Sequence, residues 1–206
     1  MYALVVNNLV TRVFPGPTGF EHNGNQYAPD IFYKWSKAEK EAIGLYEVET
    51  DSTNYKDENW YINTNESFTF SNGKVTRSWG TATAKAHADT LWTSQDKIDD
   101  KIPEGKDVGD VAVEGLKTQL IRTIKQQAAG ILQDTDWYII RKADAGTAVP
   151  SSITTHRAAV RTKCAEMETS ITNASDTPAL ETLYTYTKQE NGSITRPLGE
   201  LPRLES

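Results

Sequence analysis

Apolar and polar residues alternate along much of the first 80 residues, with the two-residue period of half-buried β-strands. Two turn pairs, Asn7-Asn8 and Asn72-Gly73, each separate two such runs. Asn and Gly tolerate the positive φ angles of tight hairpin turns, so both pairs predict β-hairpins. The pattern therefore predicts a small antiparallel sheet in this part of the chain.

One short helix is expected within this β-rich region. Ser36 is followed three residues later by Glu39, the spacing of a capping box that satisfies free amides at a helix start. Gly44 then ends the segment, because glycine adopts the left-handed conformation of a helix terminus at little cost. Residues 45–49 alternate again and predict another strand.

Beyond residue 109 the apolar residues recur every three or four positions, as in amphipathic helices. This period predicts helices over 110–132 and 151–173, a short helix ending near Arg141 and another beginning at Thr177. Together the patterns predict an α+β chain. Its parts are a β-rich module with one short helix (1–93), a linker or exposed loop (94–109), a small helical bundle (110–187) and an extended tail (188–206).

Composition and charge narrow the class of protein. Only 37% of the residues are hydrophobic, below the roughly 45–50% typical of soluble domains. This favours two small modules, an elongated shape, or a subunit whose core is completed by neighbours. The net charge is −6 and neither half is basic, so nucleic acid is not an expected partner. No apolar run is long enough to insert in a membrane, and the first residues do not resemble a signal peptide, so we expect a soluble protein made in a cytoplasm.

The residue types that carry chemistry are few and scattered. No two of the three histidines lie four residues apart, so a helical zinc pair is not expected. His156 and Cys164 fall in phase with the apolar positions of 151–173, which predicts burial rather than reactivity. We therefore expect no catalytic residue, no metal site and no cofactor, and a protein that is not an enzyme.

Aromatic residues gather in the β-rich module. Trp60, Tyr61, Phe68 and Trp79 follow one another within about twenty positions. Such a group is consistent with a core face, with a subunit contact, or with a platform that binds sugars on a host surface.

Two stretches resemble bacteriophage tail proteins. Residues 2–10 and 33–48 are similar to the opening of many small tail proteins, in which a strand–turn–strand precedes a short helix ending in Gly-Leu. Further on, Thr135-Asp136-Trp137 follows a predicted helix and precedes Val149-Pro150, as in the C-terminal motif of tail fibre assembly chaperones.

The second resemblance continues into the next helix, where Arg157 and Arg161 lie four residues apart. His156 stands where that family usually has Tyr, and the hairpin region 59–83 is not part of the short chaperones.

The resemblance implies structural roles for these residues. Trp137 would fill the centre of the bundle, and Thr135 would cap the helix that begins at Asp136. Arg157 and Arg161 would hold acidic groups of a partner or of the chain itself, or would form a solvated face.

The resemblance also implies a function. We expect a structural component of the phage tail, in or near the fibre or baseplate, made in the host cytoplasm and then incorporated into the virion. Its partners would be other tail or fibre subunits and further copies of itself, as a trimer or hexamer. The alternative is an assembly chaperone that binds a client tail protein and is absent from the virion. A weaker alternative is a module that binds host-surface carbohydrate through the aromatic residues.

Overall fold

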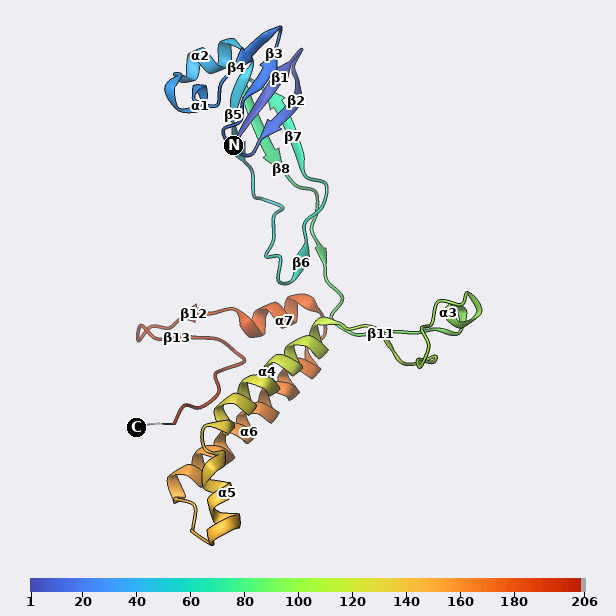
Figure 1. Cartoon of the computed structure of the whole chain (residues 1–206), viewed down its shortest axis with the longest axis vertical. Helices are drawn as coiled ribbons and strands as arrows, with labels where there is room; N and C mark the ends of the chain where they lie inside the picture. Colours follow the sequence, from blue (N-terminus) through green and yellow to red (C-terminus); the bar gives the residue numbers. More distant parts are fainter. Residues whose placement is uncertain (205–206) are drawn as a thin grey trace. The chain divides into compact units, whose positions relative to one another are not determined.

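The computed structural model describes residues 1–204, and its internal contacts divide the chain into two units (Figure 1). Unit 1 is Met1–Thr83, and unit 2 begins at Ala84. Strands dominate the first and helices the second, which confirms the α+β class. The boundary lies earlier than the predicted one after residue 93, because the backbone carbonyls of Lys85 and Ala86 accept hydrogen bonds from helices of unit 2.

Unit 1 is built on a five-stranded sheet with the strand order β2-β1-β5-β8-β7. Both predicted hairpins are confirmed, and Asn7, Asn8, Asn72 and Gly73 all have positive φ angles. The sheet is mixed rather than wholly antiparallel, since β5 and β8 run parallel. The strands are β1 (Tyr2–Val6), β2 (Leu9–Phe14), β5 (Leu45–Thr50), β7 (Ser67–Ser71) and β8 (Lys74–Ser78).

An aromatic cluster forms the core of this unit. The ring of Phe14 lies 4.8 Å from that of Phe20 and 5.7 Å from that of Phe32, between centroids. Leu4 and Leu45 from the central strands complete the cluster. Shorter elements lie beside it: β3 (Phe20–His22), β4 (Asn25–Tyr27), α1 (Ile31–Lys34) and α2 (Lys37–Ala42). Two further short strands, β6 (Tyr61–Ile62) and β9 (Thr83–Ala84), pair with each other in a separate sheet.

The predicted signals at both ends of α2 are confirmed. The Ser36 hydroxyl accepts a hydrogen bond from the Glu39 amide, and the Glu39 carboxylate accepts one from the Ser36 amide, at 2.7 Å. Gly44, just beyond the helix, has a φ of 81°. A Cβ atom at this position would lie 2.5 Å from the carbonyl oxygen of Val5, so only glycine lets the chain pass so close to β1.

Removing the Ser36 hydroxyl should lower the stability of unit 1. We expect Ser36→Ala to cost about 1 kcal/mol, because an amide at the helix start loses its acceptor. Ser36→Asp, whose carboxylate can also cap, should cost much less. Urea denaturation of both variants checks this, and equal losses would show that the cap is not the cause.

Unit 2 contains the four longest helices that the structure describes. The helix predicted over 151–173 is confirmed with those bounds, as α6. The helix predicted from residue 110 begins only at Leu116, because Val111–Val113 form a strand instead. The elements are β10 (Thr90–Leu91), α3 (Ser94–Ile98), β11 (Val111–Val113), α4 (Leu116–Gln133), α5 (Asp136–Ala145), α6 (Ser151–Asn173), α7 (Thr177–Tyr184), β12 (Thr187–Lys188) and β13 (Ile194–Thr195).

Helices α4 and α6 lie side by side and antiparallel (Figure 1). Lys125 near the middle of α4 pairs with Glu168 of α6 at 3.0 Å, while Lys117 reaches the carbonyl of Thr172 nearer the end of α6. The buried apolar residues of the two helices contribute to the core of unit 2: Leu116, Ile124, Ala128, Ile153, Val160, Cys164, Met167 and Ile171.

The predicted burial of His156 and Cys164 is confirmed. Burial raises the pKa of the Cys164 thiol, and its hydrogen bond to the Glu168 carboxylate, at 3.4 Å, adds to the effect. The thiol is therefore a small apolar core group at neutral pH.

The tail predicted as extended from residue 188 is partly folded. Strands β12 and β13 form a hairpin, in which Thr187 is paired with Thr195. Leu198, beyond the hairpin, is 2% exposed, and its amide donates to the Leu183 carbonyl at 3.0 Å. Leu198 thus holds this segment against α7, together with the Arg196 guanidinium, which lies 5.1 Å from the centroid of the Tyr184 ring.

The region predicted as a linker does not connect the two units. Residues 90–113, here called the arm, leave the helices of unit 2 next to the start of α4 and return there (Figure 1). The antiparallel pairing of β10 with β11 joins its two ends, and α3 lies between them. The arm is thus an exposed loop of unit 2, with local structure of its own.

Candidate functional site

The residues of the Thr-Asp-Trp motif lie where α4, α5 and α6 meet. Arg157 of α6 is only 7% exposed, and its guanidinium donates to the Leu132 carbonyl and to the Thr135 hydroxyl, both at 2.7 Å. It also forms an ion pair with the Asp136 carboxylate at 2.8 Å. One side chain thus ties the end of α4 and the start of α5 to α6. We call these four residues the Arg157 cluster.

Two of the predicted roles are wrong at this corner, the place where α4, α5 and α6 meet. Thr135 does not cap α5; its hydroxyl donates to the Leu132 carbonyl at 3.0 Å and accepts from Arg157. Trp137 does not fill the bundle, since it is 50% exposed. The Arg157 side chain occupies the corner instead, and the tryptophan is directed outward.

The two arginines have different environments. Arg157 holds an acidic group within the chain, as one of the predicted alternatives proposed, whereas Arg161 is exposed one turn later. The structure therefore brings Thr135, Asp136 and Arg157 together and leaves Trp137 and Arg161 outside this cluster.

Helix α5 exposes several apolar and aromatic side chains around its axis. The guanidinium of Arg141 lies 4.8 Å from the ring centroid of Trp137 and 5.5 Å from that of Tyr138. Ile139 and Ile140 are 43% and 66% exposed. Exposed apolar groups gathered on one short helix are typical of a contact surface.

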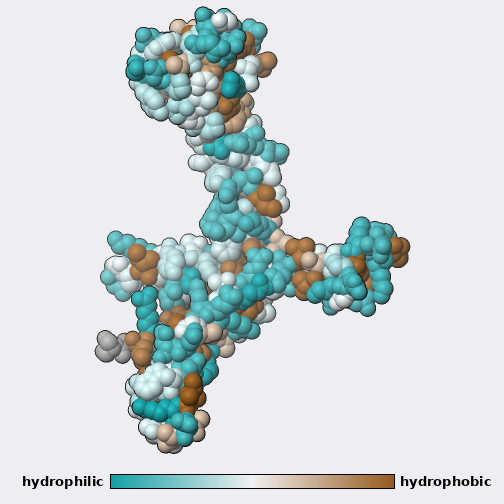
Figure 2. All heavy atoms as spheres, viewed as in Figure 1, coloured by the Kyte–Doolittle hydropathy of each residue, from teal (hydrophilic) through white to brown (hydrophobic). Residues whose placement is uncertain are grey.

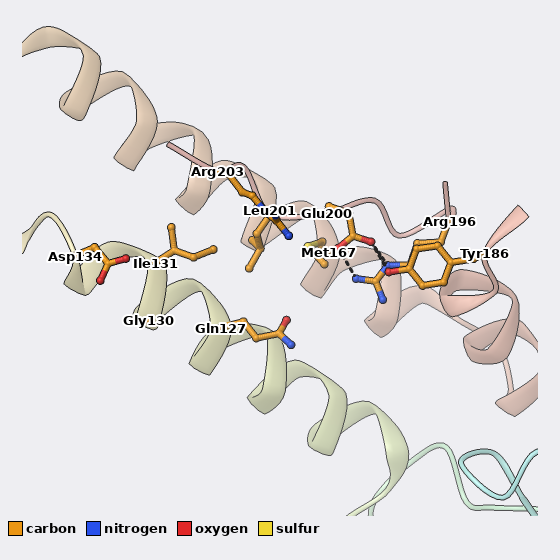
Figure 3. Close-up of a pocket in the computed structure, with 10 residues that line it drawn as sticks. All are labelled: Gln127, Gly130, Ile131, Asp134, Met167, Tyr186, Arg196, Glu200, Leu201 and Arg203. Carbon is orange, nitrogen blue, oxygen red and sulfur yellow. Dashed lines mark hydrogen bonds and ion pairs between the residues drawn. The ribbon is translucent and has the colours of Figure 1, made fainter. Parts of the chain in front are cut away.

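A groove of about 1020 Å³ lies between α4, α6 and the C-terminal segment (Figure 3). At one end Glu200 pairs with Arg196 at 2.8 Å and accepts a hydrogen bond from the Tyr186 hydroxyl at 2.6 Å, while Asp134 lies at the other end. The residues that line the groove are Gln127, Gly130, Ile131, Asp134, Met167, Tyr186, Arg196, Glu200, Leu201 and Arg203.

The groove is suited to binding a chain segment. Its charged residues are two arginines and two carboxylates, and aliphatic side chains lie between them. The groove was not predicted, because residues 188–206 were expected to form an extended tail. Arg196 and Glu200 lie four residues apart, a spacing at which opposite charges can pair. This spacing was the available sign of local structure in the tail.

The predicted aromatic platform in unit 1 is not formed. Trp60 and Tyr61 are 8% and 5% exposed, so neither ring offers a face to a sugar. Phe68 and Trp79 are half-buried. The Trp79 ring packs against Tyr55, with 4.7 Å between centroids, and beneath the Arg77 guanidinium. These aromatic residues serve the packing of the unit.

Two kinds of feature are absent from residues 1–204. No group of three or more His, Cys, Asp or Glu side chains in that range is arranged to hold a metal ion. None of the helices described there is both long enough and apolar enough to cross a membrane.

Comparison with known proteins identifies no relative. No family model matches the chain, and no curated protein or solved structure is significantly similar to it.

Proposed function

We propose that this chain is a structural, non-enzymatic subunit of a bacteriophage tail, associated with the fibre or baseplate and held there by contacts with neighbouring subunits. The observation that carries the proposal is the amount of exposed surface. The chain exposes 13505 Å², whereas two separate compact domains of these lengths would expose about 11,500 Å². The difference is surface that a neighbour would cover.

Much of the exposed apolar surface belongs to elements of unit 2 that lie outside the α4–α6 core. Figure 2 shows hydrophobic side chains, in brown, exposed over the arm and over the α5 end of unit 2. Ile98 of the arm is 77% exposed, Ile140 of α5 is 66% exposed and Ile194 of β13 is 67% exposed. Isolated exposed apolar residues are common, but groups of them on projecting elements are typical of subunit contacts.

The resemblance to tail proteins indicates which kind of assembly this subunit would join. The β1–β2 hairpin, α2 with its Gly44 end, and the Thr135–Trp137 corner all lie in the stretches that resemble small tail proteins and fibre assembly chaperones. In this proposal the chain lies in the virion tail, where its partners are other tail or fibre subunits. Copies of the chain also bind one another there and form a trimer or hexamer.

The second candidate is an assembly chaperone that binds a client tail protein and does not enter the particle. The groove between α4, α6 and the C-terminal segment favours this second candidate, because a mixed apolar and polar groove can hold a client segment. In that case Arg196 and Glu200 would lie at the client interface. The hypothesis of a carbohydrate-binding module has no comparable support, since Trp60 and Tyr61 are buried.

Mass spectrometry of purified particles distinguishes the two candidates. Phage particles washed at high salt should contain this chain in a copy number that is a multiple of three or six. Its absence from the particles, together with its recovery from infected cells bound to a fibre protein, would overturn the proposal in favour of the chaperone. The major capsid protein and a known tail protein of the same particles are the controls for recovery.

A further inference from the structure

The arm has ordered local structure without a core. All of residues 90–113 lie within the described range, and each of their side chains is half-buried or exposed. Large apolar side chains are among the most exposed. They are Leu91 at 46%, Ile98 at 77%, Val108 at 42%, Val111 at 39% and Val113 at 64%.

The interactions within the arm are weak. The hairpin is short: two residues of β10 pair with β11, and Trp92 adds backbone hydrogen bonds with Gly109 and Asp110. An isolated two-stranded hairpin is marginally stable in water. The ion pairs of Lys97 with Asp107 and of Lys101 with Asp99 are exposed, and such pairs contribute about 0–1 kcal/mol each. Ordering the backbone costs about 1–2 kcal/mol per residue. The arm therefore needs an apolar cover that the chain itself does not provide.

The base of the arm, in contrast, is firmly held. The Asp89 carboxylate accepts hydrogen bonds from the Gly115 amide at 2.7 Å and from the Thr118 hydroxyl at 2.8 Å. A Cβ atom on Gly115 would lie 2.3 Å from the backbone of Ala88. The two ends of the arm thus meet at the first turn of α4, and the apolar residues are presented from a fixed base.

A shallow groove on the outer side of α4 offers a matching surface. It has a volume of about 470 Å³. Ile121 and Ala129 supply apolar atoms to it, and Arg122 and Lys125 supply positive charge. Each cation is itself exposed and is paired within the same unit, Arg122 with Glu114 and Lys125 with the half-buried Glu168, so it remains accessible to a further carboxylate.

We propose that the arm of one copy of this chain docks on the α4 groove of a second copy. Charge selects this occupant: the arm has six acidic and three basic residues, a net charge of −3, whereas α4 has three basic and no acidic residues, a net charge of +3. Ile98 would enter the groove between Arg122 and Lys125. Opposite potentials favour encounter and fix the register of such a contact.

The contact joins two different surfaces, so it repeats from copy to copy. A head-to-tail contact of this kind closes into a ring when its rotation allows. The inference deepens the proposed function by naming the contact between copies, and it rests on that function for the expectation that copies meet. Tests on the purified chain are separate from the analysis of particles, so either proposal can fail alone.

Sedimentation velocity of the purified full-length chain tests the contact. The wild-type chain should associate as its concentration rises from about 1 to 100 μM, and Ile98→Lys should weaken association at least tenfold, because it brings a third positive charge between Arg122 and Lys125. Leu9→Lys, at an exposed apolar position on β2 of unit 1, is the control and should associate like the wild type. A wild-type chain that stays monomeric, or equal association of the Ile98→Lys variant, overturns the proposal.

Variants with reversed charges on the arm or on α4 test whether these two surfaces meet. Asp99→Lys with Glu104→Lys in the arm, and Arg122→Glu with Lys125→Glu in α4, should each abolish self-association. An equimolar mixture of the two double variants should associate again, because each arm then meets an α4 surface of opposite charge, either as the unchanged pair or as the exchanged pair. Circular dichroism of each variant should match the wild type. Failure of the mixture to associate, with both variants folded, overturns the assignment of α4 as the docking surface.

Discussion

The Phe14→Ala variant is expected to lose about 3–5 kcal/mol of the folding free energy of unit 1. Phe14 is 2% exposed and its ring contacts those of Phe20 and Phe32. Truncation removes these contacts and leaves a cavity that Leu4 and Leu45, fixed on central strands, cannot fill. A loss of this size approaches the whole stability of a small domain.

Hydrogen exchange measured by mass spectrometry can localise the effect. Peptides from β1, β2 and β5 should lose protection, while peptides from α4 and α6 should keep theirs, because the two helices share no core residue with the Phe14 cluster. Leu9→Ala, 69% exposed in the same strand as Phe14, is the control and should change stability by less than about 0.5 kcal/mol. Equal loss of protection in α6 would contradict the division into two units.

Arg157→Met should lower the stability of unit 2 by about 2–3 kcal/mol, since hydrogen bonds to a charged group contribute about 1.5–3 kcal/mol each. The methionine keeps much of the side-chain volume but donates nothing to the Leu132 carbonyl or the Thr135 hydroxyl. Asp136 is half exposed and regains water, which limits the loss.

Urea denaturation followed by circular dichroism at 222 nm measures this effect, because most helix lies in unit 2. The matched control is Arg161→Met, which removes an exposed arginine one turn later. It should change stability by less than about 0.5 kcal/mol. Equal midpoints for the two variants would show that the Arg157 cluster does not hold the corner.

Where the signals were local, the sequence predicted the fold well. The three-to-four residue period of 151–173 predicted α6, and the pairs Asn7-Asn8 and Asn72-Gly73 predicted two hairpins. The parallel pairing of β5 with β8 was not predicted, since more than twenty residues separate the strands and no periodicity records which strands meet.

The start of α4 was predicted too early for a related reason. Val113 fits the helical period of the residues that follow it, but it pairs with Thr90 across the whole length of the arm. Trp137 was expected inside the bundle from the resemblance to tail fibre assembly chaperones. The buried cation of Arg157, which takes that space, lies on another helix, and its position there depends on three helices meeting.

The buried Cys164 makes the chain well suited to site-specific labelling. It is the only cysteine in the sequence, and burial raises the pKa of its thiol, so a maleimide reagent at neutral pH would react with it slowly. A second cysteine introduced at an exposed position would therefore take up a fluorophore or spin label almost alone. Labels at the tip of the arm and on the outer face of α4 would report distances between neighbouring copies inside an intact assembly.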